Sequence, residues 1–315
     1  GFWLESDRML SLDFSQQSLD VQRQVVIEEF KQRNLNQPYG DVPHLMRKMA
    51  FRTHPYRWPT IGKGISHIAN ATLDEEKDFF FRYYAPNNCI LSITGNISFK
   101  ESVRLTEKWF GPIPQREVPQ RSLPTEPKQT EIRRKTVERN VPLDALYMAF
   151  HMCSRRDKDY YAYDMLTDIL SSGRSSRLIQ NLVVKNKIFN SVDAYISGSI
   201  DEGLLHITGK PAEGISLEQA EQAVWDEIEK LRTTPVESSE LEKVKNRYES
   251  EQIFGNINYL NVATNMAYLE LIGKAEDINT EAVRYRSVTA EQLQEVAQRS
   301  LIADNCCILY YKAIK

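Results

Sequence analysis

The feature that most constrains the fold is a concentration of prolines near the middle of the chain. Five of the 13 prolines fall between Pro112 and Pro127. Proline has no backbone N–H and a fixed φ angle, so this stretch cannot form a helix or a central strand. We therefore predict a linker at residues 112–130, between a first domain at residues 1–111 and a second at residues 131–315. The prolines are spaced too irregularly among charged residues to favour a proline-rich ligand for a partner protein.

The composition excludes several classes of protein. The 315 residues are 41% apolar and 26% charged, which is typical of a globular protein with enough volume for two cores. A net charge of −3 gives no attraction to nucleic acid or to an anionic membrane. The cysteines have no Cys-x-x-Cys spacing, and their apolar surroundings predict small buried residues in a reducing compartment. They are Cys89, Cys153, Cys306 and Cys307. We therefore expect a cytoplasmic protein without nucleic-acid or membrane partners.

Before the linker, the sequence predicts capped helices and one strand. Thr72 with Glu75 and Ser98 with Glu101 form capping boxes that predict the starts of two helices. The apolar run at residues 89–94 follows the first of these helices and predicts a strand. Helical spacing predicts two more helices, over residues 19–30 and 41–49.

After the linker, helices and strands alternate. Two strand-like runs, at residues 188–196 and 204–207, are separated by glycines and predict an antiparallel pair. A capping box at Ser216 predicts one helix, and a second box at Ser239 predicts a long helix that reaches toward Gly273. Further elements are predicted as a strand at 146–150, helices at 162–170 and 178–182, and a final helix and strand within 289–311.

The end of the chain repeats an earlier segment. An offset of 217 residues aligns Thr72 with Thr289 and, without a gap, Cys89 with Cys306. Both copies predict a capped helix, a polar turn and an apolar strand. We therefore predict two related α+β domains, each of mostly antiparallel sheet packed with helices.

No self-contained active site is visible in the sequence. There is no phosphate-binding glycine loop and no nucleophile elbow. The histidines are too far apart for two of them to share one helix face as a local metal pair. They are His44, His54, His67, His151 and His206. For each, packing or solvent exposure is favoured over a functional role.

One helix carries a candidate carboxylate. Gln22, Val25, Val26 and Glu29 fall at positions i, i+3, i+4 and i+7, which places them on one helix face. A carboxylate on an apolar face is costly to bury unless a cation or a metal pairs with it. Spacing alone still favours a position at the margin of that face, and Glu28 is expected to point to solvent.

Four segments carry a resemblance. They are Trp3–Met9, Gln22–Phe30, Pro86–Cys89 with Gly95–Ile97, and Gly173–Gln180. Together they resemble the insulinase/pitrilysin family of zinc metallopeptidases, the inverted zincins. The resemblance covers nearly the whole chain in the right order, and it implies duplicated α+β domains in agreement with the repeat.

The resemblance implies a zinc site. In this family the zinc is bound by two histidines of an inverted His-x-x-Glu-His helix, whose glutamate activates the water, and by a later glutamate. The matching positions here are Glu29 for that third ligand and Gln22 for a carboxylate that supports the site. Val183 and Asn190 stand at the positions of an arginine and a tyrosine that contact the substrate backbone. Valine cannot donate a hydrogen bond, so another subunit supplies this clamp or it is absent.

No His-x-x-Glu-His occurs in these residues. We therefore expect the chain as given to bind no catalytic zinc and to cleave no peptide, although zinc is the expected cofactor of the complete protein. Gly1 opens a helical pattern without a cap, which indicates a truncated first domain. The catalytic segment, and any targeting signal, are then expected upstream.

Two functions fit these observations. The first is the C-terminal part of a zinc metalloendopeptidase that hydrolyses peptides in a closed chamber. Its expected partners are a peptide or protein substrate, the missing N-terminal segment, and a homodimer partner or second homologous half. The alternative is a non-catalytic scaffold resembling the inactive subunits of mitochondrial processing peptidase or the core proteins of the respiratory cytochrome complex.

Overall fold

The computed structural model describes residues 1–198 and 200–314. These residues form two compact units, described separately below. Unit 1 comprises Gly1–Asp41, Trp58–Pro124 and Gly255–Ile278, and unit 2 comprises Val42–Arg57, Thr125–Phe254 and Asn279–Lys315. Each unit draws on residues from both sides of the proline-rich stretch, so the division at residues 112–130 stays a prediction. Within the described ranges, no helix has both the length and the apolar character needed to cross a membrane.

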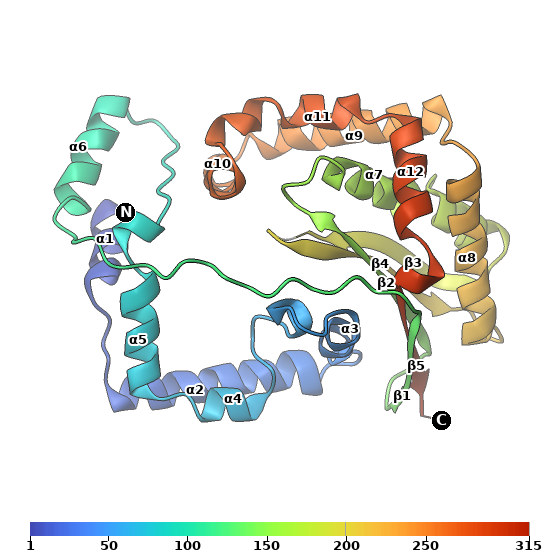
Figure 1. Ribbon diagram of the computed structural model, residues 1–315, viewed down its shortest axis with the longest axis horizontal. Coiled ribbons are helices and arrows are strands. Elements are labelled where there is room, and N and C mark those ends of the chain that lie inside the picture. The colour runs from blue at the N-terminus through green and yellow to red at the C-terminus, as the bar shows by residue number, and fades with distance from the viewer. Residues whose placement is uncertain (199, 315) are drawn as a thin grey trace. The chain divides into compact units, whose positions relative to one another are not determined.

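Unit 2 is built on one mixed sheet with the strand order β1-β5-β2-β4-β3 (Figure 1). The edge strand β1 runs parallel to β5, and the other neighbours are antiparallel. The strands are β1 (Arg133–Arg139), β2 (Ala145–Ser154), β3 (Phe189–Ser197), β4 (Glu202–Pro211) and β5 (Cys306–Ala313). The α+β prediction is confirmed, and β3 with β4 is the predicted antiparallel pair.

The strand register separates the two faces of this sheet. Met148 on β2 lies opposite Ile207 on β4 and Ile308 on β5, and all three are buried in the core. Each such side chain contributes roughly 1.5–3 kcal/mol through burial. Three helices pack on β2 and complete this core: α7 (Tyr160–Ser171), α8 (Leu217–Thr233) and α12 (Ala290–Ser300). Helix α3 (Val42–Ala50), from an earlier part of the chain, also contacts β2 and β5.

Local signals explain where most helices of unit 2 begin and end. Ser216 and Thr289 form the predicted capping boxes of α8 and α12. Gly173 follows α7 with φ +81, a left-handed angle that glycine adopts without strain. The other helical elements of this unit are η2 (Pro55–Arg57), η4 (Ile179–Lys185), α9 (Ser238–Gly255), α11 (Glu281–Ser287) and η6 (Ala303–Asn305).

The prediction of one long helix from Ser239 toward Gly273 is wrong. Helix α9 ends at Gly255, and a new helix starts after Asn258, whose side chain accepts a hydrogen bond from the N–H of Leu260. Glycine and asparagine at this point favour a turn and a fresh cap over a continued helix.

Unit 1 contains helices and no strand among its described residues. Its helical elements are α1 (Phe2–Leu10), α2 (Gln16–Phe30), η1 (Lys31–Leu35), α4 (Ile65–Ala69), α5 (Leu73–Tyr83), η3 (Pro86–Asn88), α6 (Phe99–Trp109) and α10 (Tyr259–Ile272), and η5 (Ala275–Asn279) begins here. The predicted strand at residues 89–94 is wrong. Cys89 is extended, with φ −126 and ψ 141, but no described strand pairs with this segment. A strand needs a hydrogen-bonded neighbour, which the apolar pattern alone cannot supply.

The proline-rich stretch has no helix or strand, as its composition predicts, and its end is fixed to unit 2. The Glu126 carboxylate accepts hydrogen bonds from the backbone N–H groups of Arg52 (2.7 Å), Thr53 (2.9 Å) and His54 (2.9 Å). Burial opposes the charged form, but these hydrogen bonds outweigh it and lower the pKa of Glu126. The carboxylate therefore holds residues 52–54 and 126 together.

Candidate functional site

Helix α2 presents Glu29 on a partly exposed face. The Glu29 carboxylate is 41% exposed, and its Oε1 lies 3.1 Å from Nη2 of Arg33 one turn later. Gln22 is exposed, and the residues that α2 buries are Leu19, Ile27 and Phe30. The expectation of an apolar face through Gln22 and Glu29 is therefore wrong, because α2 packs with a neighbouring stripe. Glu28 is exposed and paired with Lys31, as expected.

The described residues do not fit a zinc site. Nowhere in residues 1–198 and 200–314 do three or more His, Cys, Asp or Glu side chains converge on a possible metal position. Structural and catalytic zinc sites need three or four such ligands. Glu29 offers one carboxylate, so the third-ligand role stays a prediction that depends on residues from another segment.

The histidine rings of unit 2 are occupied by structural contacts. Nδ1 of His54 accepts a hydrogen bond from the N–H of Tyr56 (3.1 Å), which leaves the proton on Nε2, 3.1 Å from Oδ2 of Asp201. Nε2 of His151 lies 3.0 Å from the carbonyl oxygen of Ala50. Burial lowers the pKa of His151, which favours a neutral ring that donates to this carbonyl.

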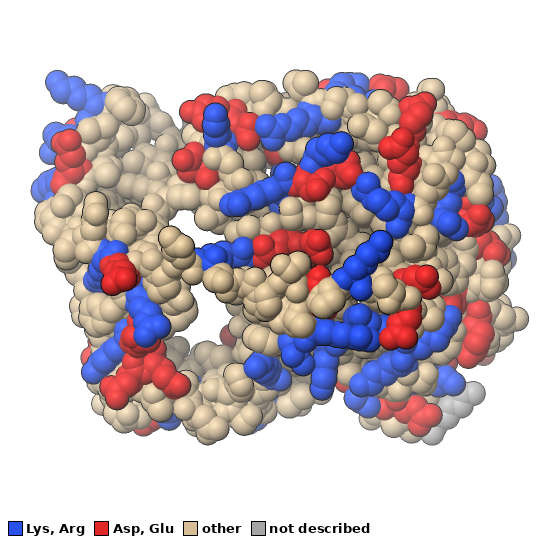
Figure 2. Space-filling model, viewed as in Figure 1, with Lys and Arg blue, Asp and Glu red and all other residues tan. Residues whose placement is uncertain are grey.

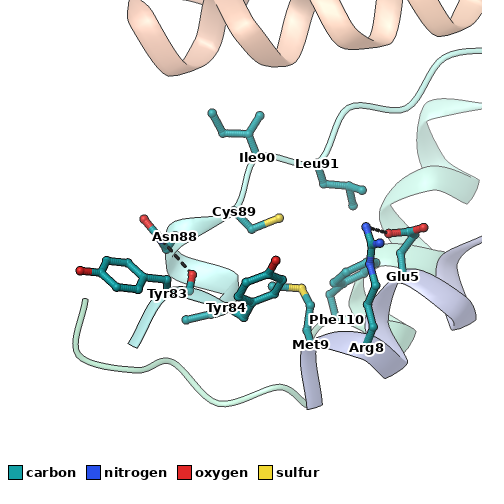
Figure 3. A pocket seen from close by; sticks show the side chains of 11 residues that line it. Glu5, Arg8, Met9, Tyr83, Tyr84, Asn88, Cys89, Ile90, Leu91 and Phe110 are labelled. Atoms are coloured by element: carbon teal, nitrogen blue, oxygen red, sulfur yellow. Dashed lines mark hydrogen bonds and ion pairs between the residues drawn. The ribbon is translucent and has the colours of Figure 1, made fainter. Parts of the chain in front are cut away.

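An apolar pocket lies in unit 1, and residues 89–91 form part of its lining. The pocket has a volume of about 350 Å³. Figure 3 shows Cys89 and Leu91 near Met9 and Phe110, with the Glu5–Arg8 ion pair at the margin. Apolar walls of this kind fit an apolar segment better than a polar small molecule.

The segment after Gly173 is structural in this conformation. Ser176 is fully buried and donates to the carbonyl oxygen of Gly173 (2.7 Å). Arg177 forms a bidentate ion pair with Glu240, at 3.0 Å from Nε and 2.7 Å from Nη2. This pairing anchors the segment just before η4 to α9.

The two substituted clamp positions lie on η4 and β3. Val183 is partly buried against the core of unit 2. Asn190 is exposed, and its amide donates to the carbonyl oxygen of Pro211 at 3.2 Å. Neither side chain offers a charged donor to a ligand, so their assignment as substituted clamp positions stays a prediction.

The cysteines differ in burial. Cys306 and Cys307 are fully buried and Cys153 is partly buried, as the sequence predicts, whereas Cys89 is exposed and the prediction for it is wrong. The reason is the lack of a strand neighbour for residues 89–94 among the described residues. All four are free thiols.

Sequence reasoning missed a group of side chains in unit 2. Tyr195 on β3 and His206 on β4 face each other in the strand register, and their rings stack with centroids 4.8 Å apart and an interplanar angle of 16°. Burial raises the pKa of Tyr195 and lowers that of His206; Asp193 adds to the first shift, and Arg47 of α3 opposes the first and adds to the second. No sequence signal links these residues, because they come from three separate elements.

Charges of both signs alternate over the visible surface of unit 2. Figure 2 shows Lys and Arg side chains intermixed with Asp and Glu, without a broad field of one sign. Ligand recognition on this unit therefore depends on particular side chains.

The described residues form an α+β fold, and among them no group of possible metal ligands surrounds Glu29. The profile of a family described as "Peptidase M16 inactive domain" matches residues 70–248. The chain belongs to this family, which confirms the resemblance found in the sequence.

Three known proteins illustrate the similarity. The zinc protease PqqE of Helicobacter pylori is 28% identical over 245 residues, which cover 77% of this chain and 55% of that protein. The uncharacterized zinc protease YmxG of Bacillus subtilis is 24% identical over 95% of this chain and 72% of its own length. The crystal structure of a protease from Helicobacter pylori superimposes with a TM-score of 0.90 at 25% identity, covering 99% of this chain and 76% of that one. The chain thus spans about half the length of the Helicobacter pylori zinc protease.

Proposed function

We propose that this chain is the part of a zinc metalloendopeptidase that supplies the third metal ligand, Glu29, and a wall of the chamber in which peptides are hydrolysed. The zinc-protease names of the relatives support this proposal. The observation that carries this proposal is the weak pairing of the Glu29 carboxylate. Within the described residues, its carboxylate is held only by a surface ion pair with Arg33, so a metal brought by another segment can replace that cation.

The remaining ligands belong, in this proposal, to a segment with His-x-x-Glu-His. Unit 1 offers that segment a place to dock, since no described strand pairs with residues 89–94, which begin beside the apolar pocket of Figure 3. The second copy of the repeat supports this, because β5 has a strand on each side. The chain alone supplies only Glu29 to the proposed zinc site, and it is expected to bind no zinc and to cleave no peptide.

The test uses the complete protein encoded with its upstream segment. Glu29→Gln keeps the size of the side chain and removes its charge, and we expect it to weaken zinc binding by roughly a hundredfold or more and to abolish peptide cleavage. Zinc content after dialysis and hydrolysis of a fluorogenic peptide are the measurements. Glu28→Gln is the matched control, because Glu28 pairs with Lys31 on another face of the same helix. Equal zinc retention in both variants would overturn the role of Glu29.

A second candidate is a non-catalytic partner subunit. Val183 favours it, since this side chain packs on the core and cannot bind a substrate backbone. If the upstream residues lack His-x-x-Glu-His, and the complete protein holds no zinc, the scaffold function replaces the peptidase function.

A further inference from the structure

Arg47 lies on α3, which approaches the sheet face that carries Tyr195 and His206. The carbonyl oxygen of Ala50, at the end of α3, contacts the ring of His151, which lies on the same face as His206. Nη1 of Arg47 donates to the carbonyl oxygen of Tyr56 at 3.3 Å. Among the described residues no carboxylate forms an ion pair with this guanidinium, although the side chain is partly buried. A partly desolvated cation gains from an anionic partner, and here the protein supplies none.

The Tyr195 hydroxyl of the aromatic pair is open to a ligand. Tyr195 is 45% exposed, and its hydroxyl has no hydrogen bond to any described residue. Burial raises the pKa of Tyr195, so the hydroxyl stays protonated and able to donate. Burial, with the nearby charge of Arg47, lowers the pKa of His206 to about 4, so its ring is neutral at physiological pH. The pair is thus a neutral, flat platform, with the charge of Arg47 acting on both rings and the carboxylate of Asp193 acting on Tyr195.

We propose that Arg47, Tyr195 and His206 form a subsite for a carboxylate carried by a peptide. The guanidinium of arginine is a planar fork of N–H donors that can form two parallel hydrogen bonds with a carboxylate. The Tyr195 hydroxyl can donate one more. The stacked rings offer an apolar surface to the rest of the ligand. One cation beside a neutral imidazole suits a monoanion better than a phosphoryl group, which carries nearly two charges. The proposal rests on the proposed function only in taking a peptide as the ligand.

The surroundings direct such a ligand to the sheet face rather than to its edge. At the edge strand β3, the hydroxyl of Ser171 accepts a hydrogen bond from the N–H of Ala194 (2.8 Å) and lies 2.9 Å from the carbonyl oxygen of the same residue. An added strand would have to displace this contact. The nearest carboxylate on the strand, Asp193, is held by the same hydroxyl at 2.8 Å.

The test measures peptide binding to this chain as it is, without zinc or further segments. The probe is a short fluorescent peptide with one central Glu and an amidated C-terminus, compared with a Gln twin and with a Gln peptide that has a free C-terminal carboxylate. We expect one or both carboxylate peptides to bind and the amidated Gln peptide to bind at least about tenfold more weakly. Preference for the Glu peptide identifies an acidic side chain as the source, and preference for the free C-terminus identifies the terminal carboxylate.

Variants of Arg47 and Tyr195, with a control on the neighbouring Lys48, locate the site. Arg47→Gln is expected to weaken carboxylate binding about tenfold or more, and Tyr195→Phe several-fold. Arg47→Lys keeps the charge without the fork and is expected to fall between wild type and Arg47→Gln. Lys48→Gln is the matched control; it removes the same charge from an exposed neighbour and should change binding less than about twofold.

Several results would overturn the proposal. They are the absence of binding by both carboxylate peptides at millimolar concentration, equal binding of all three peptides, and equal losses in the Arg47→Gln and Lys48→Gln variants. Thermal unfolding of each variant separates lost binding from lost folding. Because zinc takes no part in this assay, its outcome is independent of the Glu29 test, and either proposal can fail alone.

Discussion

Residues 72–94 and 289–311 share a local structure and differ in their surroundings. Each copy starts with a threonine capping box, continues through an 11-residue helix and makes a 3₁₀ turn. The residues that end the two helices have nearly the same backbone angles, φ −89 and ψ 71 at Tyr84 and φ −87 and ψ 63 at Leu301. Yet Cys306 begins a strand between two neighbours, whereas Cys89 pairs with no described strand. Caps and turns are thus specified locally, and a strand requires partners.

The same difference separates the two units. Of the 28 large apolar side chains that are exposed among the described residues, 21 belong to unit 1. The buried hydrophobic cluster lies wholly in unit 2. A surface this apolar marks an interaction site, in agreement with a docking segment for unit 1.

The largest expected difference is in thiol reactivity at the two equivalent cysteines. Cys89 is exposed and Cys306 is fully buried, so a thiol reagent should modify Cys89 at least about a thousandfold faster in the native protein. Absorbance of the released thiolate measures both rates, and Cys89→Ser should remove the fast phase. If the upstream segment docks as proposed, Cys89 becomes protected in the complete protein. A fast phase that survives Cys89→Ser would break the comparison.

The next largest difference is expected in the stability lost when an apolar side chain is truncated at a second pair of equivalent positions. Ile308 is 1% exposed in β5, and Leu91 is 42% exposed. Ile308→Ala should lower the free energy of unfolding by about 2–5 kcal/mol, since it leaves a cavity, whereas Leu91→Ala should change it by less than about 0.5 kcal/mol. Urea unfolding measures both. Equal losses would show that residues 89–94 are packed in solution.

Acid should destabilise the sheet of unit 2. This sheet contains β5, the strand of the second copy, and no strand from the first copy. Burial and the charge of Arg47 lower the pKa of His206 from an ordinary 6.5 to about 4. Between these pH values the unfolded chain binds a proton that the folded chain excludes, so stability is full above pH 6.5 and falls as the pH drops toward 4. The loss is at most about 3 kcal/mol. His206→Asn should flatten the pH dependence of the melting temperature, and the exposed His67→Asn should leave it unchanged.

The smallest expected difference is between the two helix caps, which should contribute equally to stability. Thr72 and Thr289 accept the same backbone hydrogen bond from the third residue of their helices. Thr72→Ala and Thr289→Ala should each cost about 1 kcal/mol of helix stability, because a cap does not depend on the strand that follows it. Hydrogen exchange of α5 and α12 measures each cost. A cost at one site alone would show that the repeat does not extend to its helices.

The sequence predicted the features that depend on neighbours along the chain. The capping boxes at Thr72, Ser216 and Thr289 are confirmed because each signal lies within four residues. The edge strand β1 (Arg133–Arg139) escaped prediction, since it has little apolar alternation and is held by pairing with β5. The buried stripe of α2 was misassigned, because the partner surface selects among several apolar stripes. Arg47 with Tyr195 and His206 could not be predicted, as sheet pairing and α3 packing bring them together.

The contact between Glu126 and residues 52–54 has a consequence for the order of folding. Synthesis runs from the N-terminus, so α3 and the loop after it emerge long before the carboxylate that fixes them and before the last strand, β5, of their sheet. Until then these residues lack the contacts with Glu126 and β5 that fix them in the folded unit, and incompletely packed segments of this kind are prone to misfolding. A fragment cut at residue 131 would also lose both α3 and its anchor. A proline-rich boundary in sequence can therefore be a poor place to divide a protein.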